Sequence, residues 1–202
     1  MKKETIAVFD FDGTITRKDT LLEFIKFSKG RWSFYCGILF LSPLLFAMKM
    51  KLLPNWKVKQ RLFSLFYQGV SIEIFDTWGA KFSTIIEQML YPKAIETLKS
   101  HQKNGDKIVI VSASIQNWIT PWANKMGIEA VLATEIEVNK KGLLTGMFLT
   151  KNCYGQEKVN RLLALFPNRN DYKLVAYGDS RGDKEMIEFA DEGFYNFTNL
   201  LK

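Results

Sequence analysis

The chain has 202 residues, of which 47% are apolar and 24% are charged, and this composition excludes a disordered or fibrous protein. Its length suits one globular domain, or a core domain with a modest insertion. The 28 basic and 21 acidic residues give a net charge of +7, which suits an anionic partner, but no Lys/Arg block is long enough to indicate a nucleic-acid-binding arm.

Short apolar, β-rich runs open the chain and recur through its second half. The first, Thr5–Phe9, has the continuous apolar pattern of a strand buried on both faces. Further strands are predicted at Lys107–Val111, Ala130–Thr134, Lys173–Tyr177 and Gly193–Phe197. Helices are predicted at Pro92–Asn104, Ser114–Met126, Gln156–Phe166 and Lys184–Ala190. Strands that alternate with helices in this way predict an α/β fold with a parallel, Rossmann-like sheet.

Two regions break that alternation. After the first strand, a long stretch rich in aromatic residues and leucine has no convincing strand pattern. We interpret residues 17–88 as a helical cap inserted after the first strand, and residues 1–16 and 89–202 as the core domain. A small β-hairpin is predicted over residues 135–149, where two short runs flank Asn139-Lys140-Lys141-Gly142.

Polar residues stand where three of the predicted strands end. In open α/β sheets, ligands bind at the carboxyl ends of the strands, so these residues are expected to meet in one crevice. A lysine early in a predicted helix and a further carboxylate complete the set. The candidate site residues are Asp10, Asp12, Ser112, Lys158, Asp179 and Asp183.

These residue types suit phosphoryl transfer. A carboxylate can attack phosphorus and form an aspartyl-phosphate, and Asp10 is the candidate nucleophile because Gly13 allows a sharp turn at its strand end. Asp12 is the candidate acid/base, which protonates the leaving oxygen and later activates water. Ser112 and Lys158 are the candidate ligands of the non-bridging phosphate oxygens.

Mg²⁺ is the predicted cofactor. This ion prefers hard oxygen ligands and usually binds through a few carboxylates together with water and a substrate phosphate. Asp10 and Asp179 can supply the carboxylates, and Asp183 is the candidate residue that orients the water molecules bound to the metal.

The order and spacing of four motifs resemble the haloacid-dehalogenase-like (HAD) superfamily over nearly the whole chain. The motifs are Asp10-Phe11-Asp12-Gly13-Thr14, Val111-Ser112-Ala113-Ser114, Lys158, and Gly178-Asp179-Ser180-Arg181-Gly182-Asp183. The resemblance implies a HAD-like core in which Asp10 is both nucleophile and metal ligand. It also implies that Asp12 gives its backbone carbonyl to the metal, and that Asp179 completes the metal site.

Within the superfamily, two features resemble subfamily IB, the phosphoserine-phosphatase-like branch. They are the insertion of the cap directly after the first motif and the sequence Cys-Tyr-Gly-Gln-Glu-Lys at residues 153–158. Phosphoserine phosphatases usually have Asn where Gly182 stands, two glycines where Ala113-Ser114 stand, and Glu near Asp19. An Asp in place of that Glu and an apolar first cap segment look more like the phosphatidylglycerophosphatase C type of lipid-phosphate phosphatase. Asp19 is therefore the candidate substrate-binding residue of the cap.

The predicted function is hydrolysis of a phosphate monoester on a small or lipid-borne substrate, such as phosphatidylglycerophosphate. The alternatives are a small-metabolite phosphatase of the phosphoserine type and a signalling receiver domain that carries an aspartyl-phosphate without turnover. The nucleophile on the first strand and the helical insertion argue against a receiver. The single histidine, His101, argues against histidine-based phosphatases, and neither cysteine is followed by the Arg that a cysteine-phosphatase loop needs. Nucleic acid is not an expected partner.

The segment Trp32–Met48 is uncharged and strongly apolar, and Pro43 interrupts it. It is shorter than the roughly 20 residues that span a bilayer. A buried cap helix is the preferred interpretation, and a surface that faces a membrane or an acyl chain is the alternative, since four lysines lie between residues 49 and 59. With two cysteines and no signal-peptide pattern, we expect a cytoplasmic protein, with peripheral contact to the inner face of the membrane through the cap.

Overall fold

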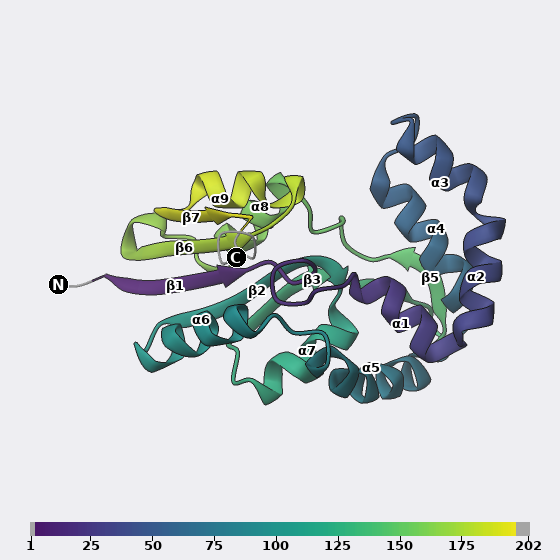
Figure 1. Cartoon of the computed structure of the whole chain (residues 1–202), viewed down its shortest axis with the longest axis horizontal. Coiled ribbons are helices and arrows are strands. Elements are labelled where there is room, and N and C mark those ends of the chain that lie inside the picture. Colours follow the sequence, from purple (N-terminus) through teal and green to yellow (C-terminus); the bar gives the residue numbers. More distant parts are fainter. Residues whose placement is uncertain (1–2, 197–202) are drawn as a thin grey trace.

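The computed structural model describes residues 3–196. Its core is a five-stranded sheet in the order β3-β2-β1-β6-β7, and every pair of neighbouring strands is parallel (Figure 1). The predicted α/β fold with a Rossmann-like sheet is confirmed. The strands are β1 Glu4–Phe9, β2 Lys107–Ile115, β3 Ala130–Thr134, β6 Tyr172–Gly178 and β7 Glu192–Tyr195.

Helices cover both faces of this sheet, which explains why its strands read as continuous apolar runs. In β1, Ala7 and Phe9 belong to one buried cluster, and Ile6 and Val8 belong to another on the opposite face. Figure 1 shows α6 and α7 on one side of the sheet and α8 and α9 on the other. These helices are α6 Pro92–Lys103, α7 Gln116–Lys125, α8 Gln156–Leu165 and α9 Lys184–Phe189.

Five helices lie between β1 and α6, beyond the carboxyl ends of the strands (Figure 1). Their interior is aromatic, and Phe24 is its centre. The Phe24 ring stacks on Trp118 of α7 with 4.6 Å between ring centroids, and it contacts Phe75 and Phe82 edge-on. The helices are α1 Thr20–Lys29, α2 Arg31–Phe40, α3 Ser42–Lys49, α4 Asn55–Tyr67 and α5 Ile72–Glu87.

The predicted hairpin is present, and it packs against α4 instead of extending the core sheet. Strands β4 (Ile136–Val138) and β5 (Leu144–Phe148) form a separate antiparallel pair. The Phe148 N–H donates to Gln60 Oε1 of α4 at 3.1 Å. Gly146 has φ +85°, and a Cβ there would overlap with Ser64 of α4, so only glycine fits this contact.

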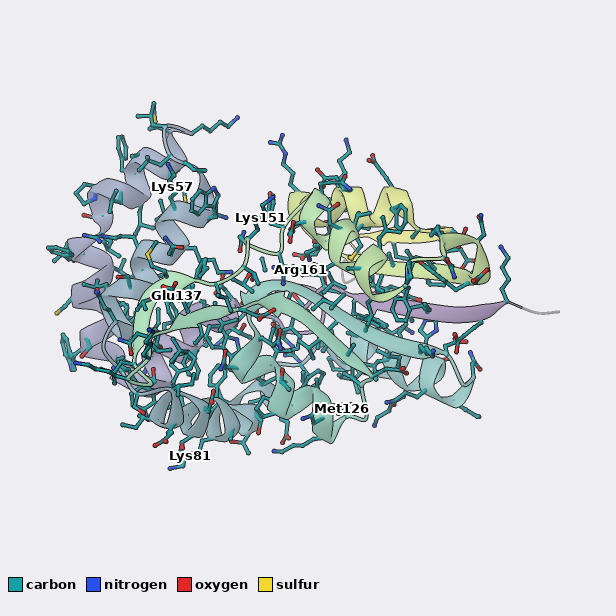
Figure 2. All side chains as sticks on the ribbon, turned by 180° about the vertical axis from the view of Figure 1, so that it is seen from behind. Lys57, Lys81, Met126, Glu137, Lys151 and Arg161 are labelled. Carbon is teal, nitrogen blue, oxygen red and sulfur yellow. The ribbon has the colours of Figure 1, made fainter. Side chains whose placement is uncertain are left out.

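The loop that leads from β5 back to the core is fixed by Arg161 of α8. Its guanidinium donates to the carbonyl of Ala133, at the end of β3, and to the carbonyl of Lys151 in the loop at 2.7 Å (Figure 2). The loop therefore has a defined path from the helical part to the first turn of α8.

The junction of β2 with the following helix and the start of the last strand differ from the predictions. Strand β2 was expected to end before Ser112 but continues to Ile115, with a register shift against β3 after Ser112. The following helix begins at Gln116 instead of Ser114, since Ser114 and Ile115 still belong to β2. The last strand begins one residue earlier than predicted, at Glu192, and the predicted end at Phe197 lies outside the described residues.

The preferred interpretation of Trp32–Met48 as a buried helix is wrong. The segment forms two short helices, α2 and α3, bent by 61° at their junction. Helix α2 buries only Phe34 and Gly37, α3 buries no residue, and the exposed fractions of Trp32 and Leu39 are 83% and 74%. Figure 1 shows the reason: these helices lie at the edge farthest from the sheet. Within residues 3–196 no single helix is long and apolar enough to cross a membrane, although the bent pair meets that test of length and composition together.

Candidate active site

The predicted site residues converge at the carboxyl ends of three adjacent strands. Asp10 follows β1, Ser112 lies near the end of β2, and Asp179 follows β6. Because β1 lies between β2 and β6 in the sheet, the parallel topology brings the three together. Lys158 in the first turn of α8 and Asp183 before α9 join them, and both are buried.

Lys158 is the centre of this cluster. Its Nζ donates to Asp10 Oδ1 at 2.6 Å, to Asp183 Oδ1 at 2.5 Å and to the Val111 carbonyl at 2.8 Å. Burial by itself lowers the pKa of Lys158, but the charges of Asp10 and Asp183 outweigh it and raise the pKa above its usual range. The ammonium therefore stays charged, next to the place where an anionic group would meet Asp10.

Asp10 is buried, and its carboxylate has few partners besides Lys158. Thr14 Oγ1 lies 3.4 Å from Asp10 Oδ2, on the side away from Lys158. Burial raises the pKa of Asp10 to about 7; Lys158 opposes this shift and the charge of Asp183 adds to it. A carboxylate in this setting is stabilised by any further positive charge at its open oxygen.

Asp12 has partners of its own, which belong to a chain of hydroxyl groups. Its Oδ1 accepts from the Thr20 N–H at 2.8 Å, and its Oδ2 accepts from Ser114 Oγ at 2.5 Å. Ser114 in turn accepts from Thr20 Oγ1, which accepts from Trp118 Nε1. Burial raises the pKa of Asp12 to about 6, and the charge of Asp19 adds to this effect. A carboxyl group with a pKa near neutrality can both give and take a proton.

Oxygen atoms of Asp10, Asp179 and Asp183 lie within 4.8 Å of one another, which is a suitable spacing for one cation. Asp183 has little capacity left, since its Oδ1 binds Lys158 and its Oδ2 accepts from Ser180 Oγ and from the N–H groups of Asp179 and Ser180. Asp183 thus braces the turn. Asp10 Oδ2 has only the long contact with Thr14, and Asp179 accepts from Thr14 through Oδ1, so both carboxylates retain lone pairs for a metal. Two carboxylates, with the other positions left to water or phosphate, fit what Mg²⁺ prefers.

Gly13 allows Asp179 to reach this position. It has φ +88°, and a Cβ there would overlap with the Asp179 carboxylate. Thr14, the next residue, donates from Oγ1 to Asp179 Oδ1 at 3.3 Å. The turn after β1 is therefore shaped to hold the carboxylate that follows β6.

Lys59 of α4 also reaches the site, and its place there was missed in the sequence. Its Nζ donates to the carbonyl of Ala113 at 2.7 Å, directly after Ser112. Burial lowers the pKa of Lys59, against the opposing charges of Asp19, Asp12 and Asp10. The sequence pattern that could have indicated this role is the position of Lys59 on the apolar face of α4, which buries Val58 and Leu62.

Asp19, the predicted substrate-binding residue, is exposed at the start of α1. Its Oδ1 accepts from the Leu22 N–H at 3.1 Å and so caps the helix. It is close enough to Asp12 and Lys59 for their charges to interact. The structure thus places Asp19 at the edge of the site, with a structural role of its own.

A groove of about 800 Å³ lies between the start of α4, the end of β5 and the loop that leads to α8. Trp56 and Gln60 line it from α4, and Phe148 lines it from the hairpin. Tyr154 lines it from the loop and packs so closely on Gly182 that a Cβ there would overlap with its ring. The groove therefore borders the segment that carries Asp179 and Asp183.

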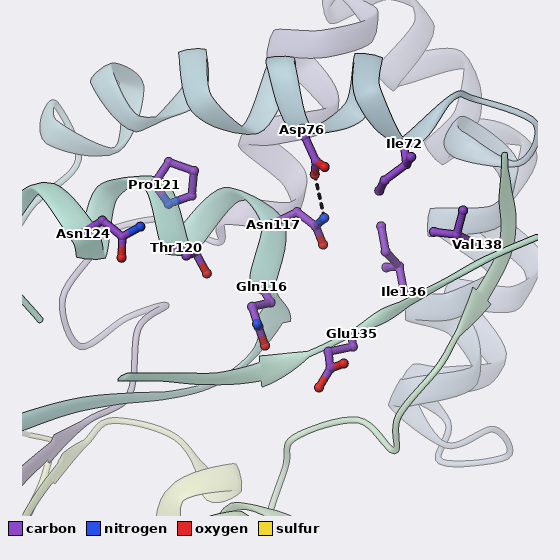
Figure 3. Close-up of a pocket in the computed structure, with 10 residues that line it drawn as sticks. All are labelled: Ile72, Asp76, Gln116, Asn117, Thr120, Pro121, Asn124, Glu135, Ile136 and Val138. Carbon is purple, nitrogen blue, oxygen red and sulfur yellow. Dashed lines mark hydrogen bonds between the residues drawn. The ribbon is translucent and has the colours of Figure 1, made fainter. Parts of the chain in front are cut away.

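A second cavity, of about 540 Å³, lies between α5, α7 and the start of the hairpin (Figure 3). Asn117 of α7 donates to Asp76 of α5 across it at 2.7 Å. None of the predicted site residues lines this cavity, so it is separate from the crevice at the strand ends.

Comparisons with known proteins show the fold and the family of this chain. Protein CicA of Caulobacter vibrioides is 34% identical over 193 residues, which are 94% of this chain and 85% of CicA. The solved structure of a protein of unknown function from Bordetella pertussis has a TM-score of 0.80 at 20% identity, covering 94% of this chain and 88% of the other. A substrate-bound phosphoserine phosphatase has a TM-score of 0.63 at 18% identity, covering 96% and 87%.

The sequence profile of haloacid dehalogenase-like hydrolases matches residues 7–188, nearly the whole described chain. That range begins within β1 and ends in α9, so it includes all the predicted site residues and the helices between β1 and α6. The prediction that the protein is an enzyme is thereby confirmed, and the chain belongs to the haloacid dehalogenase-like hydrolase family.

Proposed function

We propose that the protein is a Mg²⁺-dependent phosphatase that hydrolyses a phosphate monoester through an aspartyl-phosphate on Asp10. The observation that carries this proposal is the buried contact of Asp10 with Lys158, beside a second carboxylate, Asp12, whose pKa is near neutrality. A nucleophile, an acid/base and a fixed positive charge then stand at one strand end, as hydrolysis in two steps requires.

In the first step, an Asp10 oxygen attacks phosphorus while Ser112 and Lys158 hold the non-bridging oxygens. Asp12 donates its proton to the leaving oxygen, so that the alcohol departs neutral. In the second step, Asp12 takes a proton from water, the water oxygen attacks phosphorus, and the bond to Asp10 breaks. Bound Mg²⁺, held by Asp10, Asp179 and the backbone carbonyl of Asp12, would supply positive charge that favours ionised Asp10 and offsets the phosphate.

We propose that residues 17–88 form the cap that selects the substrate, in a protein of the phosphoserine-phosphatase-like branch, subfamily IB. The hairpin belongs to the core segment of the chain but packs against α4 of this cap. Two substrate classes fit this assignment. A small metabolite is supported by the fold shared with phosphoserine phosphatase. A lipid-borne phosphate, as in the phosphatidylglycerophosphatase C type, is supported by the exposed apolar side chains of α2 and α3, which would place a peripheral enzyme at the inner face of a membrane.

The test is phosphate release, with and without Mg²⁺, from phosphatidylglycerophosphate, phosphoserine, phosphocholine and nucleotides. We expect many turnovers on at least one substrate with Mg²⁺ and none with EDTA. Labelling of one phosphate per chain without turnover would contradict the proposal and favour the receiver alternative, and metal-independent hydrolysis would overturn the magnesium assignment.

Replacing Lys59 by Met should raise KM for the best water-soluble substrate by roughly 10-fold, while kcat changes less. The reason is that Lys59 brings a positive charge to a site crowded with the carboxylates of Asp10, Asp12 and Asp19. Steady-state kinetics provide the measurement, and Lys57→Met is the matched control, since Lys57 is exposed on the same helix. Equal KM values for both variants would show that Lys59 does not act on the substrate's charge.

A further inference from the structure

The outer surface of α2 and α3 is apolar to an unusual degree. The exposed fractions of Phe40 and Leu52 are 71% and 75%, comparable to that of Trp32. We define the apolar arm as α2, α3 and the turn to α4, residues 31–54. Its exposed large side chains include Trp32, Tyr35, Leu39, Phe40, Phe46 and Leu52. Large exposed apolar side chains gathered on two consecutive helices mark a contact with a partner or a membrane.

The exposure follows from how α2 packs. Its buried residues, Phe34 and Gly37, continue to Leu41 at the junction and form one narrow stripe at spacings of three and four. Gly37 lets the ring of Phe66 from α4 approach, and a Cβ would overlap with that ring. This stripe, with Ile38 partly buried beside it, forms the packed face of α2, and the side chains of Trp32, Tyr35, Leu39 and Phe40 are exposed.

The charge around the arm is of one sign. From residue 24 to residue 72 the sequence has no Asp or Glu and has eight basic residues: Lys26, Lys29, Arg31, Lys49, Lys51, Lys57, Lys59 and Arg61. Arg31, Lys49 and Lys51 lie at the ends of the two helices and are exposed. None of the three takes part in an ion pair among residues 3–196. These unpaired cations around an apolar centre are complementary to a layer of anionic headgroups above hydrocarbon.

The helices suit a position in the interface better than a span. They are 10 and 8 residues long and bent by 61°, and they carry Trp32 and Tyr35, residue types that favour the headgroup level. The start of α4 follows the arm directly, and its Trp56 is partly exposed while also lining the groove beside the site. A surface bound to the arm would therefore adjoin the groove.

We propose that the apolar arm docks the protein onto the surface of an anionic bilayer, with its apolar side chains below the headgroups and its lysines and arginine among them. Docking of this kind would let a phosphorylated lipid reach the groove without leaving the bilayer. As a route for the substrate, the docking rests on the proposed phosphatase function. The binding itself needs no catalysis and can be measured alone.

The test is co-sedimentation of the full chain with vesicles of phosphatidylcholine alone or of phosphatidylcholine and phosphatidylglycerol in equal parts. We expect binding to the anionic vesicles to be about 10-fold tighter or more, and to weaken in 0.5 M salt (roughly three times the physiological ionic strength), where headgroup charges are screened. Equal binding to both vesicles, or none to either, would overturn the proposal.

Two double variants separate the parts of the surface. Trp32→Ser with Leu39→Ser should weaken binding to anionic vesicles by about 10-fold or more, because it removes inserted apolar area. Lys49→Gln with Lys51→Gln should remove most of the preference for anionic lipid. Leu165→Ser, an exposed apolar residue on α8, is the matched control and should bind as the wild type does.

Hydrolysis of a water-soluble substrate is measured on the same samples and should be equal in all of these variants. If the wild-type protein hydrolyses the substrate but does not bind the vesicles, the docking proposal is wrong and the phosphatase proposal stands. If it binds the vesicles but hydrolyses no substrate, the phosphatase proposal is wrong and the docking proposal stands. Sedimentation velocity tests whether the arm joins two copies of the chain instead. A dimer of the wild type that becomes a monomer in the variant Trp32→Ser with Leu39→Ser would overturn the proposal.

Discussion

Asp10→Asn should abolish phosphate release, with a loss of roughly 10³-fold or more, and leave the protein folded. The amide oxygen of Asn can still accept from Lys158, but it cannot displace an alcohol from phosphorus. The replacement also removes one of several buried carboxylates, so we expect the free energy of unfolding to stay within about 1 kcal/mol of the wild type. Phosphate release and urea denaturation measure the two effects.

The matched control is Asp171→Asn, which removes the same charge from an exposed position outside the crevice. It should keep full activity. Turnover at more than a few per cent of the wild-type rate in Asp10→Asn would mean that water attacks phosphorus directly, and the covalent intermediate would have to be given up.

Lys158→Met should lose both activity and stability. The ammonium is the shared partner of Asp10 and Asp183, and its removal leaves both carboxylates buried without a counterion. Breaking a buried ion pair in this way costs about 3–5 kcal/mol, so urea denaturation at pH 8 in EDTA should give a free energy of unfolding lower by about that amount. At this pH the wild-type Asp10, with a pKa of about 7, is mostly ionised.

The comparison variant is Lys184→Met, which breaks the pair with Glu188 at the surface of α9, where both side chains are more than half exposed. Its effect should be below about 1 kcal/mol. If Lys158→Met were as stable as this control, the carboxylates would have to be neutral in the folded protein, and the assignment of Lys158 as a fixed positive charge would be wrong.

The sequence predicted the core of the site because parallel strands impose their own geometry. Asp10, Ser112 and Asp179 each stand at the end of an apolar run, and parallel packing of those runs leaves only one edge where they can meet. Lys158, in the first turn of α8, and Asp183, five residues after β6 ends, could be found by the order of the motifs. Their roles stay predictions until the variants are measured.

Features that depend on contacts between distant helices were not predictable in the same way. Lys59 reaches Ala113 only because α4 turns one particular face toward the core, and no local pattern specifies that rotation. The hydrogen-bonded chain from Trp118 to Asp12 joins α7, α1, β2 and the turn after β1, and it was not predictable for the same reason. The apolar composition of Trp32–Met48 indicated a helix but could not decide between burial and exposure, because both states have the same local sequence requirements.

The close contact of Gly146 with Ser64 has a consequence for how such enzymes diversify. The contact joins α4 to a hairpin that lies some eighty residues further along the chain, and both segments line the groove beside the site. Recombination that exchanged only the first segment between two relatives would bring together a helix and a hairpin that had never been selected to fit. Under the proposed role of the cap, specificity would depend on this matched pair of segments, so a change in one that disturbs the contact requires a fitting change in the other.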